Sequence, residues 1–337
     1  MAGDDQTREI DDIIAATTFD LLKSEDQIQL SNVIDDLRAQ NVGQLLPEDG
    51  LPQLIVCGDE SSGKSSVLEA LTRVRFTVRS NTCTTFATEL RLRRQPTVRI
   101  SSKIKPGAAR TSIEKERVEN FRGSFSAQSK FPDLINAARE CMNQNTDRQS
   151  TLFDDVLQVE IVGPDLAPLT FVDLPGFIHY RDSSEMNHDI NTVTTLVQSY
   201  MKQSNSIILA VIPASASINT QAVLKHISEI VPDGSRTLGI ITEPDEVPRG
   251  SEKEQDLIDF ARNRGFKYGW HAVQNRGYGE QEISSEERDE IERKFFEKSP
   301  CQNLPSNEVG YKIDSLRTKL GKLLVDKIHP GLSTISY

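Results

Sequence analysis

The chain has 337 residues, of which 36% are hydrophobic and 26% are charged. This is the composition of a globular protein and excludes a collagen-like or wholly disordered chain. The 50 acidic residues outnumber the 39 basic ones, and the resulting net charge of −11 disfavours a nucleic-acid partner. The four cysteines are far apart and lack metal-ligand spacing, and neither a signal peptide nor a bilayer-spanning apolar run is apparent. We therefore expect a soluble cytoplasmic protein.

Helices are expected near both ends of the chain. A capping box at residues 24–27 begins a polar helix over residues 25–39. Apolar residues recur every three or four positions over residues 313–328, which predicts a second, amphipathic helix that ends at Pro330. These helices either pack against each other beside the main body or each cover part of the core.

Between these ends, short β-branched segments alternate with helical segments. Strands are expected at residues 54–57, 156–162, 170–173, 206–212, 237–242 and 271–273, and helices at residues 65–71, 191–202, 221–230 and 252–262. This alternation predicts an α/β fold with a mostly parallel sheet covered by helices on both faces. We also expect an antiparallel pair of strands at residues 90–94 and 156–162, a helical surface insertion at 101–150, and a solvated helix at 281–298 capped by Ser284 and Glu287.

The strongest motif is Gly58-Asp-Glu-Ser-Ser-Gly63-Lys64-Ser65, which fits G-x-x-x-x-G-K-[ST] between an expected strand and an expected helix. In such a loop the glycines let backbone N–H groups turn inward onto the phosphates of a nucleotide. Lys64 would reach the β- and γ-phosphates, and the Ser65 hydroxyl would bind Mg²⁺. The sequence therefore predicts a P-loop that binds a nucleoside triphosphate.

Two further motifs follow expected strands. Asp173-Leu-Pro-Gly176 offers an acid for the Mg²⁺ shell and a glycine N–H for the γ-phosphate. Thr242-Glu-Pro-Asp245 places the carboxylate of Asp245 where it can accept both donors of the Watson–Crick edge of guanine, and residues 273–276 form a second loop on the base side. Because adenine has no ring N–H on that edge, the acid favours GTP over ATP.

These motifs resemble those of the dynamin superfamily. The resemblance is carried by residues 58–70, 173–176 and 233–242, by Leu-Pro-Gln at 51–53, and by their order and separation. It covers roughly residues 20 to 330. The stretch Ser-Asn-Thr-Cys-Thr-Thr-Phe-Ala-Thr and the Gly-Trp-His box look most like Mx-like and fungal dynamin-related members.

The resemblance implies three parts in the chain. Residues 48–310 would form the extended P-loop GTPase domain, and residues 1–47 and 311–337 would contribute helices to a small bundle signalling element. In the family, a long helical stalk follows such a domain.

The resemblance also implies roles for single residues. Thr84 matches the switch threonine, with Thr85 as the neighbouring alternative, and Ser61 matches a serine that helps to hold a charge-compensating monovalent cation. Asn275 and Arg276 would border the base and the ribose. The implied nucleotide-binding set is Asp59, Glu60, Ser61, Ser62, Gly63, Lys64, Ser65, Ser66, Asp173, Gly176, Thr242, Glu243, Asp245, Asn275 and Arg276, with Ser65, Thr84 and Asp173 at Mg²⁺, and Glu60, Ser61, Lys64, Thr84 and Gly176 in hydrolysis.

Three positions depart from the family pattern. Glu60 stands where the family has a glutamine that orients the attacking water. Its carboxylate would add like charge near the γ-phosphate, be protonated, or act as a general base. Glu243 replaces a lysine that packs on the purine, and Ala214-Ser-Ala-Ser217 lacks an aspartate near the dimer face. These changes bear on turnover more than on binding.

The leading prediction is a dynamin-like GTPase that hydrolyses GTP to GDP and phosphate with Mg²⁺, stimulated when two domains form a homodimer through the nucleotide face. The full-length protein would remodel membranes or assemble, peripheral to organelle membranes, and would contact membranes, microtubules or organelles only through stalk regions. One alternative is a GTP-binding interaction module with weak or no hydrolysis, because of Glu60 and the loop at residues 242–245. The other is an ATP-dependent P-loop enzyme, because of the same loop.

Overall fold

The computed structural model describes residues 52–74, 76, 84–123, 131–144, 152–164, 166, 169–178, 184–277, 280, 283–298 and 309–333. The strands are β1 (Gln53–Gly58), β2 (Ala87–Arg94), β3 (Arg99–Lys105), β4 (Val156–Gly163), β5 (Leu169–Asp173), β6 (Ser206–Pro213), β7 (Thr237–Thr242), β8 (Trp270–Ala272) and β9 (Val309–Tyr311). The helices are α3 (Lys64–Thr72), α4 (Ser112–Glu119), α5 (Phe131–Asn143), α6 (Ser184–Lys202), α7 (Ala222–Ile230), α8 (Glu252–Asn263), α9 (Ser285–Glu297) and α10 (Ile313–Ser333). Short 3₁₀ turns lie at Ile218–Thr220 and Pro244–Glu246.

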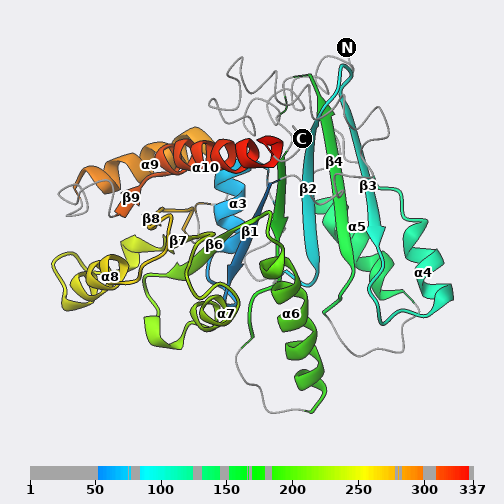
Figure 1. Cartoon of the computed structure of the whole chain (residues 1–337), viewed down its shortest axis with the longest axis horizontal. Helices are drawn as coiled ribbons and strands as arrows, with labels where there is room; N and C mark the ends of the chain where they lie inside the picture. The colour runs from blue at the N-terminus through cyan, green and yellow to red at the C-terminus, as the bar shows by residue number, and fades with distance from the viewer. Residues whose placement is uncertain are drawn as a thin grey trace.

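All nine of these strands form one mixed sheet in the order β3-β4-β2-β5-β1-β6-β7-β8-β9 (Figure 1). Most neighbours are parallel, as predicted, and the antiparallel neighbours are β2 with β5 and β3 with β4. Strand β1 lies inside the sheet between β5 and β6, with Ile55 opposite Val172 on one side and Ile208 on the other. The P-loop follows β1, so the sheet places this loop near its centre.

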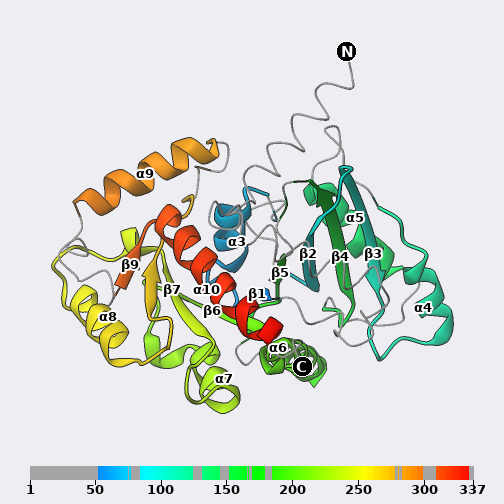
Figure 2. The same cartoon turned by 45° about the horizontal axis from the view of Figure 1, so that its top comes forward.

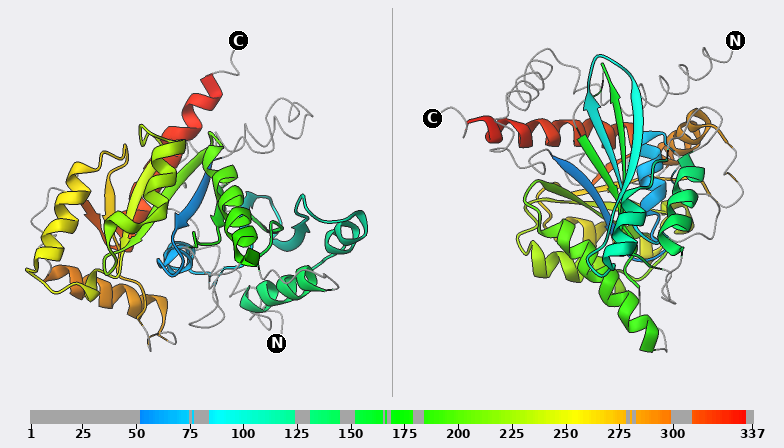
Figure 3. Two further views of the ribbon diagram at one scale, coloured as in Figure 1. Left: turned by 90° about the horizontal axis from the view of Figure 1, so that it is seen from below. Right: turned by 90° about the vertical axis from the view of Figure 1, so that its right-hand side faces the viewer.

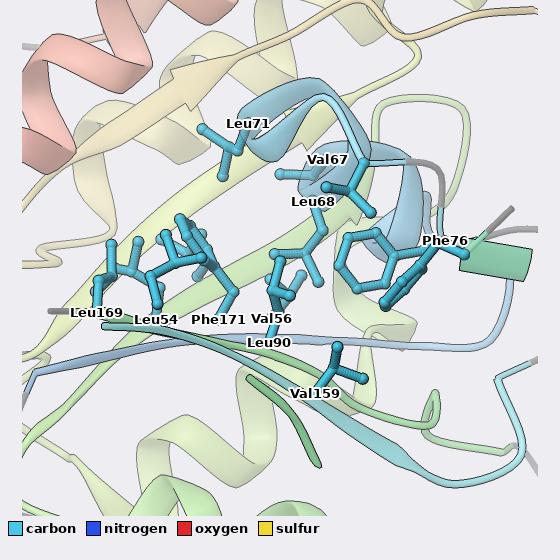
Figure 4. Close-up of a cluster of buried hydrophobic side chains, with 14 of the residues drawn as sticks. Leu54, Val56, Val67, Leu68, Leu71, Phe76, Leu90, Val159, Leu169 and Phe171 are labelled. Carbon is cyan, nitrogen blue, oxygen red and sulfur yellow. The ribbon is translucent and has the colours of Figure 1, made fainter. Parts of the chain in front are cut away.

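Strand β1 is buried on both faces because its side chains alternate between two separate apolar clusters. Leu54 and Val56 belong to the cluster that includes α3, where Leu68 and its neighbours point toward the strand (Figure 4). Ile55 and Cys57 belong to the cluster on the opposite face. A strand buried in this way reads as a continuous apolar run rather than an alternating one, which is typical of the centre of a parallel sheet.

Helices cover both faces of the sheet. Helices α3, α5 and α10 contribute to the first cluster, and α10 crosses the sheet beside α3 (Figure 2). Helices α6, α7 and α8 contribute to the second cluster, and the left view of Figure 3 shows them from below. The prediction of an α/β fold with helices on both faces is therefore confirmed.

One predicted strand pairing is wrong. Strand β2 pairs with β4 in parallel, with Leu90 opposite Val159, and not as an antiparallel edge pair. The connection between them contains β3, α4 and α5, which is long enough for a parallel crossover. The expected helical insertion at 101–150 also begins with β3, an edge strand whose exposed Arg99 and Lys103 gave its sequence a polar character.

Two predicted helices differ in detail from the structure. The capping box of Ser284 and Glu287 at α9 is confirmed, but one face of this helix, which includes Phe296, is buried rather than solvated. Helix α10 continues past Pro330 to Ser333, so the predicted end at this proline is wrong. The expected helix at residues 25–39 lies outside the described residues.

None of the helices in the described ranges is long and apolar enough to cross a membrane. Cys57 and Cys141 are free thiols, and burial raises the pKa of the Cys57 thiol to about 12. The other two cysteines lie outside the described residues.

Candidate nucleotide-binding site

The P-loop connects β1 to α3 through a backbone that turns sharply twice. Ser61 has φ 61° and Gly63 has φ 86°, both in the left-handed region. Gly63 caps α3 and provides no side chain to bond the first N–H groups of the helix. A helix N-terminus of this kind attracts anions through its dipole and its N–H groups. The local geometry is therefore that of a phosphate cradle, with the side chain of Ser61 exposed at its rim.

The P-loop touches the loop that follows β5. Phe177 N–H donates to the carbonyl oxygen of Gly58 at 3.1 Å, and Glu60 N–H donates to the carbonyl oxygen of Phe177 at 2.9 Å. A Cβ on Gly176 would lie only 2.7 Å from the backbone N of Glu60 and 2.7 Å from Lys64 Nζ. The lysine is 6% exposed, and its Nζ donates to the carbonyl oxygen of Asp59 at 2.8 Å. The two loops that were predicted to meet around the γ-phosphate are therefore in contact.

Three oxygen-bearing side chains meet beside this contact. Ser65 lies in the first turn of α3, Thr84 lies before β2, and Asp173 ends β5. Ser65 Oγ donates to Asp173 Oδ2 at 2.9 Å, Thr84 Oγ1 donates to the same oxygen at 3.2 Å, and the two hydroxyl oxygens are 3.2 Å apart. We call Ser65, Thr84 and Asp173 the hydroxyl–carboxylate cluster.

The electrostatics of this cluster suit a hard cation. Burial raises the pKa of Asp173, while the hydrogen bonds from Ser65 and Thr84 and the charge of Lys64 lower it in part. Its second oxygen, Oδ1, is buried and lacks a hydrogen-bond partner among the described residues. Leaving a buried acceptor unpaired is costly, and Mg²⁺ prefers oxygen ligands. The residues present therefore fit Mg²⁺, whereas the described ranges hold no cluster of three His, Cys, Asp or Glu side chains.

Two of the predicted nucleotide-binding residues form hydrogen bonds within the protein that hold the P-loop. The Asp59 carboxylate accepts the N–H groups of Ala222 and Val223, at 3.0 and 3.2 Å, and so caps helix α7. Thr242 Oγ1 donates to the carbonyl oxygen of Ser62 at 2.8 Å. Both side chains hold the loop in place through contacts within the protein.

The loops after β7 and β8 lie where the sequence predicts the base side of the site. Asp245 is exposed, yet desolvation of its carboxyl group raises its pKa, and a hydrogen bond from the Gln274 side chain lowers it in part. Asn275 Nδ2 and Gln274 Oε1 are buried and lack partners among the described residues. These polar atoms are available to a ligand that offers matching donors and acceptors.

Two other predicted base-side residues contact the protein instead. Glu243 has a left-handed backbone with φ 55°, and its carboxylate accepts from Ser215 Oγ at 2.9 Å. Arg276 pairs with Glu69 of α3 at 2.5 Å and donates to the carbonyl oxygen of Ile283 at 3.2 Å. Arg276 therefore joins the base loop to α3 and the start of α9.

Sequence reasoning missed Gln274 as a member of this site. It lies in the loop 273–276, which was assigned to the base side, and its position next to Asn275 was the available signal. Ser62 contributes a buried hydroxyl without a partner among the described residues, and Ser66 is partly buried in the first turn of α3.

Comparison with known proteins identifies relatives for most of the chain. Residues 54–244 match the dynamin family. The interferon-induced GTP-binding protein Mx of Epinephelus coioides is 32% identical over 305 residues, which cover 89% of this chain and 46% of that protein. Mx2 of Oncorhynchus mykiss is 30% identical over 311 residues, with 89% and 45% covered. Mx of Perca fluviatilis is 32% identical over 275 residues, with 79% and 83% covered.

The chain spans about half the length of the first two relatives. The family match begins in β1 and ends just before Asp245, so it contains the P-loop, the cluster of Ser65, Thr84 and Asp173, and Gly176. The chain therefore belongs to the dynamin family and contains its GTPase domain.

Proposed function

We propose that this chain hydrolyses GTP to GDP and phosphate in a Mg²⁺-dependent reaction. The proposal is carried by the hydroxyl–carboxylate cluster, whose buried Asp173 Oδ1 lacks a partner among the described residues, next to Lys64 at the mouth of a P-loop. This combination provides a cation site and a phosphate site in contact with each other. Relatives named GTP-binding proteins support the choice of nucleotide.

The phosphates would be held by the first turn of α3 and by Lys64. Ser65, Thr84 and Asp173 would hold Mg²⁺, which supplies positive charge against the charge that develops on the phosphates. The N–H of Gly176 would donate to the γ-phosphate, and its lack of a Cβ permits the approach of Lys64. These groups are oriented before the reaction, and such preorganisation is the main source of catalysis in phosphoryl transfer.

The base would be read by Asp245 and Asn275. The Asp245 carboxylate would accept the ring N–H and the exocyclic amine of guanine, because it lies in the 3₁₀ turn directly after β7, on the expected base side. Asn275 Nδ2 would donate to an acceptor of the base, which gives this buried atom a partner.

The test is phosphate release from GTP with Mg²⁺, measured beside Lys64→Ala. We expect both the affinity for GTP and the turnover rate of this variant to fall by a factor of at least about 100, since it lacks the charged side chain that would bind the phosphates. Lys225→Ala is the matched control, because Lys225 is 77% exposed on α7 and its loss should leave the rate unchanged. Unchanged GTP affinity in Lys64→Ala would show that the site is assigned wrongly.

A second candidate is a GTP-binding interaction module with weak or no hydrolysis. It is favoured by Glu60, whose Cα lies 2.7 Å from the position of a Cβ on Gly176 and which therefore places an acid beside the expected γ-phosphate. Like charge there would oppose hydrolysis. Under this candidate, Glu60→Gln raises the rate of phosphate release while GTP affinity changes little, and an equal or lower rate in that variant counts against it.

We also propose that two GTPase domains form a homodimer through the nucleotide face. Residues 48–310 would be the GTPase domain, and residues 1–47 and 311–337 would form the bundle helices that lead to a stalk. A monovalent cation near Ser61, whose side chain is exposed at the rim of the P-loop, would complete the charge balance. For the full-length protein, we propose membrane remodelling, a cytoplasmic location and contact with organelle membranes through stalk regions. Sedimentation of the protein with GDP and aluminium fluoride tests the dimer, which we expect only when both are present.

A further inference from the structure

Helix α9 carries a buried ion pair that contacts the base side of the site. Arg288 and Glu292 lie four residues apart, which places them on one face of the helix. Their side chains are only 3% and 2% exposed, and Arg288 NH1 lies 3.1 Å from Glu292 Oε2. We call these two residues the α9 clamp.

The carboxylate of the clamp joins two separate segments of backbone. Glu292 Oε1 accepts the N–H of Gln274 at 2.9 Å, and Oε2 accepts the N–H of Ile313 at 2.8 Å. Gln274 is the second residue of the base loop 273–276, which follows β8, and Ile313 is the first residue of α10. One buried carboxylate therefore fixes the base loop to the start of a long helix, which provides a rigid support.

The guanidinium of the clamp holds the same loop from a second direction. Arg288 NH2 donates to the carbonyl oxygen of Gln274 at 2.5 Å and to Asn275 Oδ1 at 3.2 Å. Because the amide oxygen of Asn275 accepts from the clamp, its Nδ2 is directed elsewhere, where it is buried and lacks a partner among the described residues. The clamp thus sets which end of the Asn275 amide is offered to the base.

The effect of the clamp extends to Asp245 through one residue. Both the N–H and the carbonyl oxygen of Gln274 are bonded to the clamp, and a hydrogen bond from the Gln274 side chain is among the causes that lower the pKa of the Asp245 carboxyl. The clamp therefore fixes the backbone of a residue whose side chain lies beside Asp245.

We propose that Arg288 and Glu292 are positioning residues for guanine recognition, which hold Asp245 and Asn275 in the geometry that distinguishes guanine from a base lacking its exocyclic amine. The inference rests on the proposed function, because it assigns a role in reading the base of the same nucleotide. Neither residue is placed in contact with the nucleotide, and both act through Gln274 and Asn275.

The chemistry of the clamp explains why these two residue types are present. A carboxylate accepts two N–H groups and a guanidinium at once, whereas an amide has only one accepting oxygen. A planar guanidinium donates to several acceptors in fixed directions, whereas an ammonium acts as a point charge. Glu292→Gln and Arg288→Lys should each loosen the loop while preserving most of the side-chain volume.

The experiment compares binding of GDP and IDP to the full chain with Mg²⁺ by calorimetry. IDP lacks only the exocyclic amine, and neither ligand has a γ-phosphate to hydrolyse. We expect the wild-type protein to prefer GDP by at least about tenfold, since an amine bonded to a carboxylate is a strong hydrogen bond. In Glu292→Gln and in Arg288→Lys, this preference should fall by at least about fivefold. A role limited to stability would lower the folded fraction but leave the ratio of the two affinities unchanged.

Arg293→Ala is the matched control. Arg293 pairs with Glu290 and Glu297 on the exposed face of the same helix, at 47% side-chain exposure, so its loss should leave the preference unchanged. Urea unfolding establishes whether each variant is folded, and Arg288→Lys decides the matter if Glu292→Gln does not fold. A folded clamp variant with the wild-type preference overturns the proposal. A wild-type protein that binds ADP as tightly as GDP contradicts the proposed function instead.

Discussion

Acid should destabilise this fold through one buried histidine. His271 lies in β8 with none of its surface exposed, and burial lowers its pKa from 6.5 to about 4. Its Nε2 lies 2.8 Å from the carbonyl oxygen of Lys312, which can only accept, so Nε2 carries the proton. Its Nδ1 is buried without a partner among the described residues and lies 2.3 Å from where a Cβ on Gly310 would be. A second proton on this ring therefore has no acceptor among the residues that the structure describes.

The size and sign of the effect follow from the two pKa values. Between about pH 6.5 and pH 4, the unfolded chain binds a proton at His271 that the native protein does not bind. Stability from this residue is therefore complete above pH 6.5 and is lost as the pH falls toward 4. Each pKa unit corresponds to about 1.4 kcal/mol, so the full loss is about 3 kcal/mol.

The assay is urea unfolding of the wild-type protein and His271→Gln across this pH range. Glutamine keeps an N–H for the carbonyl oxygen of Lys312 but does not titrate, so it serves as the reference. We expect the difference in free energy of unfolding between the two proteins to change by about 2–3 kcal/mol between about pH 7 and pH 4. Two parallel curves would refute the reasoning, because the histidine would then have the same pKa in both states.

Two further predictions concern the P-loop. Asp59→Ala should lower the free energy of unfolding by about 1–2 kcal/mol, because the first N–H groups of α7 lose their acceptor. Asp59→Asn keeps one accepting oxygen and should lower the free energy of unfolding less. Urea unfolding midpoints measure both effects, and equal stability of the wild-type protein and the two variants would contradict the capping role. Gly176→Ala should lower the affinity for GTP relative to the affinity for GDP by at least about tenfold. The added methyl group would push the loop that follows β5 away from Glu60 and Lys64. Competition between the two nucleotides measures this ratio, and an unchanged ratio would mean that the two loops do not close around the γ-phosphate.

The parts of the fold that sequence could predict are those with local signals. The P-loop begins with an apolar strand and ends at the start of a helix, and both elements follow from residues within the same short segment. The capping box at Ser284 of α9 is likewise contained in four residues. Motifs and elements of this kind were placed correctly without any knowledge of the sheet.

The parts that sequence could not predict depend on contacts between distant segments. The parallel pairing of β2 with β4 is decided by the crossover between them, and the short β9 has only three residues to signal it. Asp59 caps a helix that begins 163 positions later, and the N-cap residue of that helix, Gln221, gives no sign of this. The clamp of Arg288 and Glu292 lies on a helix whose charged sequence predicts solvent exposure, so its burial emerges only from packing.

The central claim is that Ser65, Thr84 and Asp173 form the Mg²⁺-dependent centre of a GTPase. The most direct measurement is phosphate release from GTP over a range of Mg²⁺ concentrations, at several protein concentrations, for the wild-type protein and Asp173→Asn. The account predicts release that requires Mg²⁺, increases per molecule as protein concentration rises, and in Asp173→Asn needs more Mg²⁺ and is slower by at least about 100-fold. Release that is independent of Mg²⁺, or equal in the two proteins, would contradict it.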